Sequence, residues 1–187
     1  DTATTEIYTH SLHDALPIFR AMAGSCDVFF YELGLKVGVD RIAAMARKMG
    51  LGATLGIDLP GEAAGFIPTR EWKRTALKQP WWQGDTLITS IGQGAVLGTP
   101  LQLAIMAARV ANGGKAVAPR LTRELRDGPT VTQMALDPEI LPANLGISPE
   151  SLAIVAGAMS AVVNEPGATA YGSRISVPGF AMAGKTG

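Results

Sequence analysis

The 187-residue sequence contains a single cysteine, Cys26, which excludes an internal disulfide and a cysteine-based zinc site. It also lacks any apolar run near the ~20 residues of a membrane span, and no signal peptide is visible. Any anchor or export signal is therefore expected outside this chain. An excess of one charge is missing too, because 16 Lys and Arg balance 16 Asp and Glu. This balance removes the usual reason to expect nucleic acid or an acidic membrane surface as a partner.

The first 20 residues differ in pattern from the rest of the chain. Their apolar residues keep neither a helical nor a strand period for long, and the stretch SLHDALPIF resembles translated sequencing-adapter sequence. We therefore expect 1–20 to be a non-native or disordered leader and 21–187 to form the domain. His10 and His13 lie in this leader and have no third ligand of clear role, so they do not predict a metal site.

Capping residues mark the starts of several helices after the leader. Thr99-Pro100-Leu101-Gln102 is a capping box with proline at the first helical position, and it predicts a helix that is apolar nearly all round. Thr69 and Ser148 predict two further helix starts. A helix is also predicted over 39–50. The face that this helix is expected to bury is formed by Ile42, Met45, Ala46 and Met49.

Extended structure is predicted at three places. Residues 81–94 mix β-branched residues with glycines, which is typical of a strand or an extended turn. Residues 115–125 and 180–187 are predicted to be strands. With the hydrophobic content of 47%, these elements indicate a folded chain with a real core.

The C-terminal residues GFAMAGKT, 179–186, fit two different site patterns. They satisfy G-x-x-x-x-G-K-[ST], the P-loop of nucleotide-binding proteins. A P-loop needs a buried strand before it and a helix N-terminus facing phosphate after it, and neither is convincing here. The last three residues also form K-T-G, the third motif of serine acyl transferases of the penicillin-binding protein and β-lactamase kind. K-T-G is a weak signal alone, so the other motifs of the chain decide between the two patterns.

Six segments resemble, in sequence and in order, those of class B penicillin-binding proteins, and among them the elongation-specific peptidoglycan D,D-transpeptidases. The segments are GSCDVFFYELGLKVGVDRI, GIDLPGE, PTREWK, WWQGDTLITSIGQG, TPLQLA and AGKTG. The resemblance covers about residues 21–187. It implies an α+β fold, a partial penicillin-binding-protein transpeptidase (serine β-lactamase-like) fold, with a helical lobe and part of an antiparallel sheet.

By this resemblance, Ser25 and Asp27 belong to the second motif of the site, with aspartate where asparagine is usual. An ionised carboxylate only accepts hydrogen bonds, so donors such as a lysine ammonium would have to orient Asp27. The Ser25 hydroxyl would relay a proton to the departing D-alanine amine. Lys185 and Thr186 would bind the substrate's terminal carboxylate, and Gly187 would leave room for the peptide.

The residues also have simpler interpretations. Ser25 and Asp27 are common helix caps, and Lys185 is typical of a solvated strand edge. The nucleophile motif S-x-x-K is absent, because no serine of the chain has lysine at the third position after it. The chain is therefore expected to be a fragment that does not carry out acyl transfer itself.

The resemblance implies a parent enzyme that acts on peptidoglycan stem peptides, is acylated by β-lactam antibiotics and works with the cell-wall elongation machinery. It would need no metal or organic cofactor. It would be tethered to the inner membrane on the periplasmic side. The alternatives are a β-lactamase or β-lactam sensor domain of the same fold group, and a P-loop nucleotide-binding protein.

Overall fold

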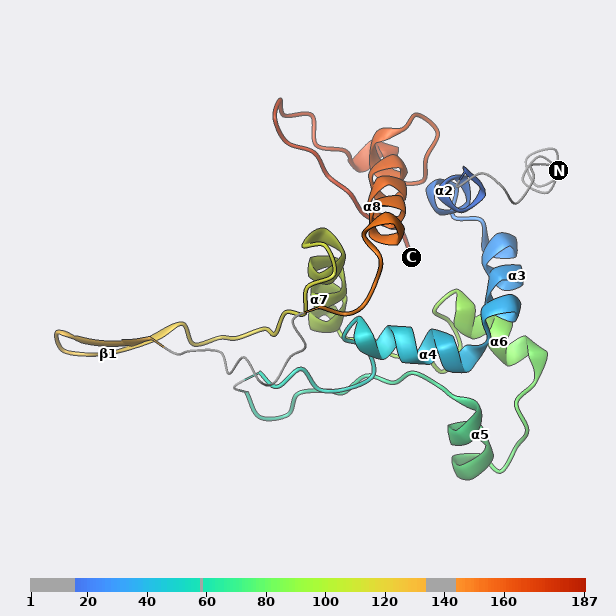
Figure 1. Cartoon of the computed structure of the whole chain (residues 1–187), viewed down its shortest axis with the longest axis horizontal. Coiled ribbons are helices and arrows are strands. Elements are labelled where there is room, and N and C mark those ends of the chain that lie inside the picture. Colours follow the sequence, from blue (N-terminus) through green and yellow to red (C-terminus); the bar gives the residue numbers. More distant parts are fainter. Residues whose placement is uncertain (1–15, 58, 134–143) are drawn as a thin grey trace.

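The computed structural model of the chain describes residues 16–57, 59–133 and 144–187. Within these ranges, a helical lobe carries one projecting β-hairpin (Figure 1). The elements are α2 (Leu16–Ala23), α3 (Asp27–Val37), α4 (Val39–Lys48), α5 (Arg70–Ala76), α6 (Gln83–Ser90), α7 (Pro100–Ala111), β1 (Glu124–Asp127), β2 (Thr130–Gln133), α8 (Pro149–Asn164) and the 3₁₀ turn η1 (Tyr171–Ser173). The predicted α+β class, with a helical lobe and a small antiparallel sheet, is confirmed.

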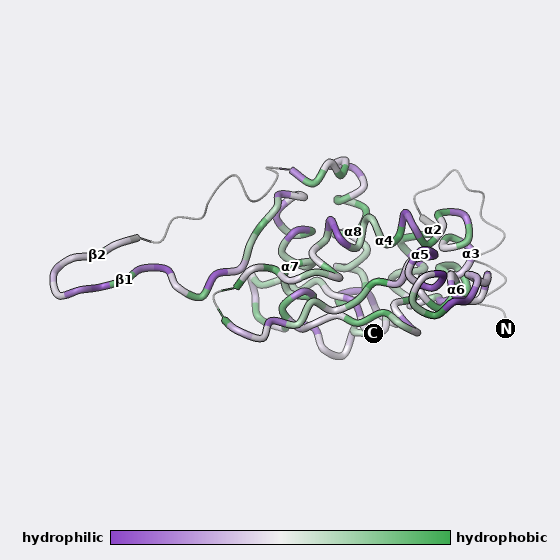
Figure 2. Tube along the Cα trace, turned by 90° about the horizontal axis from the view of Figure 1, so that it is seen from below, coloured by the Kyte–Doolittle hydropathy of each residue, from purple (hydrophilic) through white to green (hydrophobic). Residues whose placement is uncertain are grey.

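The hairpin of β1 and β2 extends away from the helices and is largely hydrophilic (Figures 1 and 2). Its antiparallel register places Glu124 opposite Gln133 and Asp127 opposite Thr130. The strand predicted over 115–125 is therefore wrong for most of its length, because only its last two residues belong to β1. Tertiary contacts override the strand pattern there, as when the carbonyl of Val117 accepts a hydrogen bond from Arg109.

Helices α2 and α8 pack side by side and form part of the core (Figure 1). Ala21 of α2 and Ala158 of α8 are fully buried, and a Cβ on Gly157 of α8 would lie 3.4 Å from the Phe19 ring of α2. Burying apolar surface contributes roughly 25 cal/mol per Å² to folding. The last five residues of the predicted leader, Leu16–Arg20, belong to α2. Residues 1–15 lie outside the described residues, so for them the leader stays a prediction.

The strand or extended turn predicted over 81–94 is wrong, because residues 83–90 form helix α6. The Asp85 carboxylate accepts a hydrogen bond from the backbone N–H of Trp82, which supports the first turn. Helix α6 packs so closely on α3 that a Cβ on Gly34 would lie 2.4 Å from the Cβ of Ser90. Packing therefore decides the conformation of a segment whose β-branched residues favour a strand.

Helix α7 begins at the predicted capping box: the Thr99 hydroxyl accepts from the Gln102 N–H and the Gln102 side chain accepts from the Thr99 N–H. A helix that is apolar nearly all round is expected deep in a core, but α7 is not buried on every side, because Leu103 is half exposed. The fully buried Gln102 instead donates to the carbonyls of Ala53 and Ala64, both at 2.8 Å. This side chain satisfies polar groups of the loop that α7 covers.

Helix α4 confirms the helix predicted over 39–50, but its buried face differs from the predicted one. Met45 is exposed, whereas Val39 and Ala43 are fully buried. Arg109 of α7 donates to the carbonyl of Lys48 and so supports the C-terminal end of α4.

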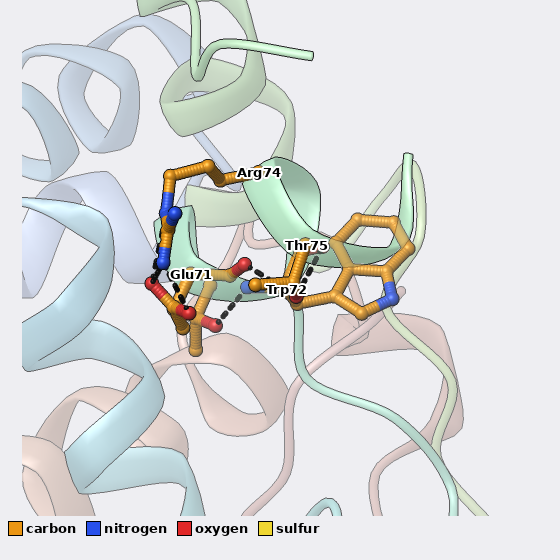
Figure 3. A network of polar contacts seen from close by, with 5 residues as sticks. Glu71, Trp72, Arg74 and Thr75 are labelled. Atoms are coloured by element: carbon orange, nitrogen blue, oxygen red, sulfur yellow. Dashed lines mark hydrogen bonds and ion pairs between the residues drawn. The ribbon is translucent and has the colours of Figure 1, made fainter. Parts of the chain in front are cut away.

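Helix α5 begins at Thr69, as predicted, because the Thr69 hydroxyl accepts from the Trp72 N–H at 3.1 Å. Its exposed side carries a local network in which Arg74 donates to both oxygens of the Glu71 carboxylate and Thr75 donates to backbone carbonyls (Figure 3). The opposite side turns Lys73 inward to pair with Asp85 of α6.

Candidate active site

An open pocket of about 740 Å³ lies where the α2–α3 turn, the residues after α6, the turn after α8 and the C-terminal segment meet. All five residues predicted for the site, Ser25, Asp27, Lys185, Thr186 and Gly187, line it. In Figure 1 the C-terminus ends beside α8, facing the turn between α2 and α3. The fold therefore brings together two motifs that are 160 residues apart.

Ser25 occupies a strained backbone position between α2 and α3. The N–H of Cys26 donates to the carbonyl of Ala21, and the N–H of Ser25 donates to that of Met22. This pair of hydrogen bonds is the Schellman end of a helix, whose left-handed position usually holds glycine. Ser25 adopts it with φ of 50°, at a cost of roughly 1–2 kcal/mol for an L-residue. Such strain is typical of residues whose side chain is needed at a site.

The Ser25 hydroxyl does not cap α3. Cys26 occupies the N-cap position of that helix, and its side chain makes no capping hydrogen bond. The Oγ of Ser25 instead accepts a hydrogen bond from Nζ of Lys185 at 2.6 Å. This contact joins the second and third predicted motifs directly.

Lys185 is exposed in the pocket and is held by neutral oxygens. Besides Ser25, its ammonium donates to the carbonyl of Thr186 at 2.7 Å. No carboxylate of the described residues lies within ion-pair distance of it. Its positive charge is therefore not neutralised by this part of the chain and can attract an anionic group that enters the pocket.

A third hydroxyl completes the cluster. Thr169, in the turn after α8, lies 3.0 Å from the Thr186 hydroxyl and 3.4 Å from the Ser25 hydroxyl, oxygen to oxygen. The hydroxyls of Ser25 and Thr186 are themselves 3.1 Å apart. The pocket therefore presents three hydroxyl groups and one ammonium group to a ligand.

Asp27 lines the same pocket from the first turn of α3. A negative charge at this end of a helix is favourable. The ammonium of Lys185 donates to the Ser25 hydroxyl and not to Asp27. In the described ranges, no hydrogen bond joins the Asp27 side chain to another residue. The lysine contact expected for Asp27 is therefore not formed between these residues.

The segment that carries Lys185 is not a strand, and the strand predicted over 180–187 is wrong within the described structure. The segment is attached to α8 instead. The N–H of Gly184 donates to the carbonyl of Met159, and Asn164 donates to the carbonyl of Met182. The Gly184 N–H, which a P-loop would direct toward phosphate, is thereby occupied.

Among the described residues, no cluster of three or more His, Cys, Asp or Glu side chains could hold a metal ion. None of the helices that the structure describes is both long and apolar enough to cross a membrane.

Comparison with known families identifies the domain. The family model described as the penicillin binding protein transpeptidase domain matches residues 3–187. The chain belongs to this family, which confirms the resemblance stated from its motifs. Neither the nucleotide-binding nor the β-lactamase alternative is supported by these comparisons.

Within the family, the chain is similar to peptidoglycan D,D-transpeptidases. It is 36% identical over 177 residues to MrdA of Salmonella typhimurium (strain LT2), a peptidoglycan D,D-transpeptidase, and the match covers 94% of this chain. MrdA of Escherichia coli (strain K12) is 35% identical over 176 residues. The chain spans 28% and 27% of the length of these two relatives.

Solved structures agree with this placement. The crystal structure of Pseudomonas aeruginosa PBP2 in complex with WCK 5153 superposes with a TM-score of 0.80 at 36% identity, covering 90% of this chain and 37% of that one. The complex between PBP2 and MreC from Helicobacter pylori gives a TM-score of 0.72 at 32% identity, covering 90% of this chain and 29% of that one. The penicillin-binding transpeptidase fold, present in part, is thereby established.

Thr169 is the residue of the hydroxyl cluster that was not predicted. No motif quoted from the sequence contains it, and its partners Ser25 and Thr186 are 144 and 17 residues away along the chain. The sequence carries no signal for such a contact, because only the packing of α8 on α2 brings the turn to the pocket.

Proposed function

We propose that the protein containing this chain is a peptidoglycan D,D-transpeptidase. A serine hydroxyl would attack the carbonyl of the penultimate D-alanine of a stem peptide and expel the terminal D-alanine. An amine of a neighbouring stem peptide would then attack the acyl-enzyme ester and release the serine. The names of the similar proteins support this reaction. No metal or organic cofactor takes part in this chemistry.

One observation supports the assignment most strongly: the 2.6 Å contact between Lys185 Nζ and Ser25 Oγ in an open pocket. Lys185 supplies a positive charge and Thr186 a hydroxyl donor for the terminal carboxylate of the substrate. The Ser25 hydroxyl both donates and accepts, so it can pass a proton to the departing amine. Asp27 and Gly187 shape the pocket around the peptide.

The cellular setting follows from the same proposal. The enzyme would work on the periplasmic side of the inner membrane, bind β-lactam antibiotics and act with the cell-wall elongation machinery. The similar PBP2 of Helicobacter pylori is solved in complex with MreC, and another similar chain comes from a structure of a peptidoglycan synthase complex. Both complexes support a partner of the cell-wall synthesis machinery.

Binding of a substrate fragment tests the carboxylate site. We expect the chain to bind diacetyl-L-lysyl-D-alanyl-D-alanine about tenfold or more tightly than the same peptide with a C-terminal amide, because a hydrogen bond to a charged group contributes about 1.5–3 kcal/mol. The measurement is a titration of isotopically labelled chain followed by NMR. Lys185→Met should abolish the preference for the carboxylate, and Lys115→Met, a second exposed lysine, should keep it. Equal affinity of the unmutated chain for both peptides would refute the proposed function.

The chain by itself should not form a covalent penicillin adduct, because no serine in it belongs to an S-x-x-K motif. Intact-mass spectrometry after incubation with a fluorescent penicillin measures this directly. A stoichiometric adduct on any serine of the chain would overturn this part of the proposal.

A further inference from the structure

We propose that Thr169 is a second hydroxyl donor to the terminal carboxylate of the substrate and acts beside Thr186. This inference rests on the proposed function and adds a specificity-determining residue to the same site. The ligand class is a peptide that ends in a free carboxylate. Thr169 is assigned from its position in the pocket and from its contacts with the two predicted motifs.

The three hydroxyl protons can serve the three hydroxyl contacts of the cluster, but one of these contacts is weak enough for a ligand to replace. Lys185 is a donor only, so Ser25 Oγ accepts from it and directs its own proton toward one of the two threonines. The Ser25–Thr169 distance of 3.4 Å is the longest of the three hydroxyl contacts and is the weakest hydrogen bond. When Ser25 donates to Thr186 and Thr186 donates to Thr169, the Thr169 proton has only this weak contact and is available to an acceptor in the pocket.

A carboxylate suits this arrangement better than a neutral group does. Its two oxygens accept two parallel hydrogen bonds, and the hydroxyls of Thr169 and Thr186 are neighbours, 3.0 Å apart. When both threonines turn their protons to a carboxylate, Thr186 can still accept from Ser25, and Ser25 can still accept from Lys185. Every hydroxyl proton of the cluster then has an acceptor, and the ammonium donates to Ser25 Oγ and to the carbonyl and hydroxyl oxygens of Thr186. The charge of this ammonium balances the charge of the ligand.

The turn that carries Thr169 is held by its backbone, independently of the hydroxyl. The N–H of Thr169 donates to the carbonyl of Ala23 at the end of α2, and the N–H of Ala170 donates to the carbonyl of the fully buried Val162 of α8. The side chain itself is exposed to the pocket. Removing the hydroxyl should therefore change ligand binding without unfolding the turn.

A set of variants of the full 187-residue chain tests the assignment with the same two peptides. Thr169→Val keeps the shape and removes the hydroxyl, Thr169→Ser keeps the hydroxyl, and Thr132→Val on β2 is the remote control. We expect Thr169→Val to weaken binding of the carboxylate peptide about tenfold and to leave binding of the amide peptide within about twofold. Thr169→Ser and Thr132→Val should bind both peptides like the unmutated chain.

The background of Thr186→Val separates direct contact from an effect that acts through Thr186. If each threonine donates to its own carboxylate oxygen, Thr169→Val should weaken carboxylate binding further in that background. No further weakening there would overturn the assignment of Thr169 as a donor.

Equal weakening of both peptides by Thr169→Val would indicate a structural role and would also overturn the assignment. If Thr169→Val does not fold, the smaller Thr169→Ala replaces it in the same comparison. An undiminished preference for the carboxylate in the folded hydroxyl-free variant would refute the role of Thr169 alone. Absence of that preference in the unmutated chain would instead refute the proposed function, and the assignment of Thr169 would fall with it.

Discussion

Two lysines of this chain occupy opposite environments. Lys73 of α5 is buried, with 8% of its surface exposed, and pairs with the Asp85 carboxylate of α6. Lys185 is exposed in the pocket and is held by two hydroxyl oxygens and one carbonyl oxygen, with no carboxylate partner among residues 16–57, 59–133 and 144–187. The charge of Lys73 is thus neutralised inside the fold, whereas the charge of Lys185 remains available to a ligand.

The difference separates a structural lysine from a candidate functional one. A buried ammonium has lost its hydration and needs its carboxylate, so the pair joins two helices. An exposed ammonium that contacts neutral oxygens keeps its charge and is positioned without being neutralised. The groups that a lysine contacts therefore indicate whether its role is structural or functional.

Replacing each lysine by methionine tests this comparison and should give the largest difference. Lys73→Met leaves Asp85 without its cation and should lower the free energy of unfolding by about 2 kcal/mol. This is below the ~3–5 kcal/mol of a fully buried pair, because the Asp85 side chain remains 28% exposed. Lys185→Met should change it by less than about 0.5 kcal/mol. Urea unfolding of the two variants measures both values.

In ligand binding, the same two variants should differ in the opposite direction. Lys73→Met should keep the preference for the carboxylate peptide, and Lys185→Met should lose it. Similar losses of stability in the two variants would contradict the distinction between the lysines.

A smaller effect concerns the pH dependence of stability. Burial disfavours the charged form of Asp85, but the hydrogen bonds from Lys73 and from the Trp82 N–H outweigh burial and lower its pKa below the ordinary aspartate value. A lowered pKa in the folded state stabilises the protein above the unfolded-state pKa of about 3.9. That stability is lost as the pH falls through the folded-state pKa.

We therefore expect the stability of the unmutated chain to fall more steeply below about pH 4 than that of Asp85→Asn. The difference in unfolding free energy between these two proteins should be smaller than the loss of unfolding free energy caused by Lys73→Met. Urea unfolding at a series of pH values from neutral to acidic gives both curves. Parallel curves would show that the Lys73–Asp85 pair does not contribute to stability in this way.

The elements that could be predicted are those with local causes. The caps at Thr69, Thr99 and Ser148 each form a hydrogen bond with a residue three positions ahead, so a short stretch of sequence contains the whole interaction. Residues 81–94 and 180–187 were predicted wrongly. The first becomes partly helical against α3, and the second is attached to α8 by single hydrogen bonds instead of strand pairing.

The candidate site likewise contains residues that could be predicted from the sequence and one that could not. Ser25, Asp27 and the last three residues were proposed from motifs, because the chemistry of a serine acyl transferase requires those residue types in that order. Their roles remain predictions, although the structure places all of them at one pocket. Thr169 could not be predicted, since no local pattern distinguishes it from other threonines of the chain.

The amino-acid sequence by itself determined the family, several helix starts and the residue types available for chemistry, because these depend on motifs and on hydrogen bonds between near neighbours. Only the tertiary structure decided which lysine is neutralised, which helix faces are buried and which hydroxyl joins Ser25 and Thr186. Those outcomes depend on contacts between residues up to 161 positions apart, and packing sets such contacts without leaving a periodic pattern in the sequence.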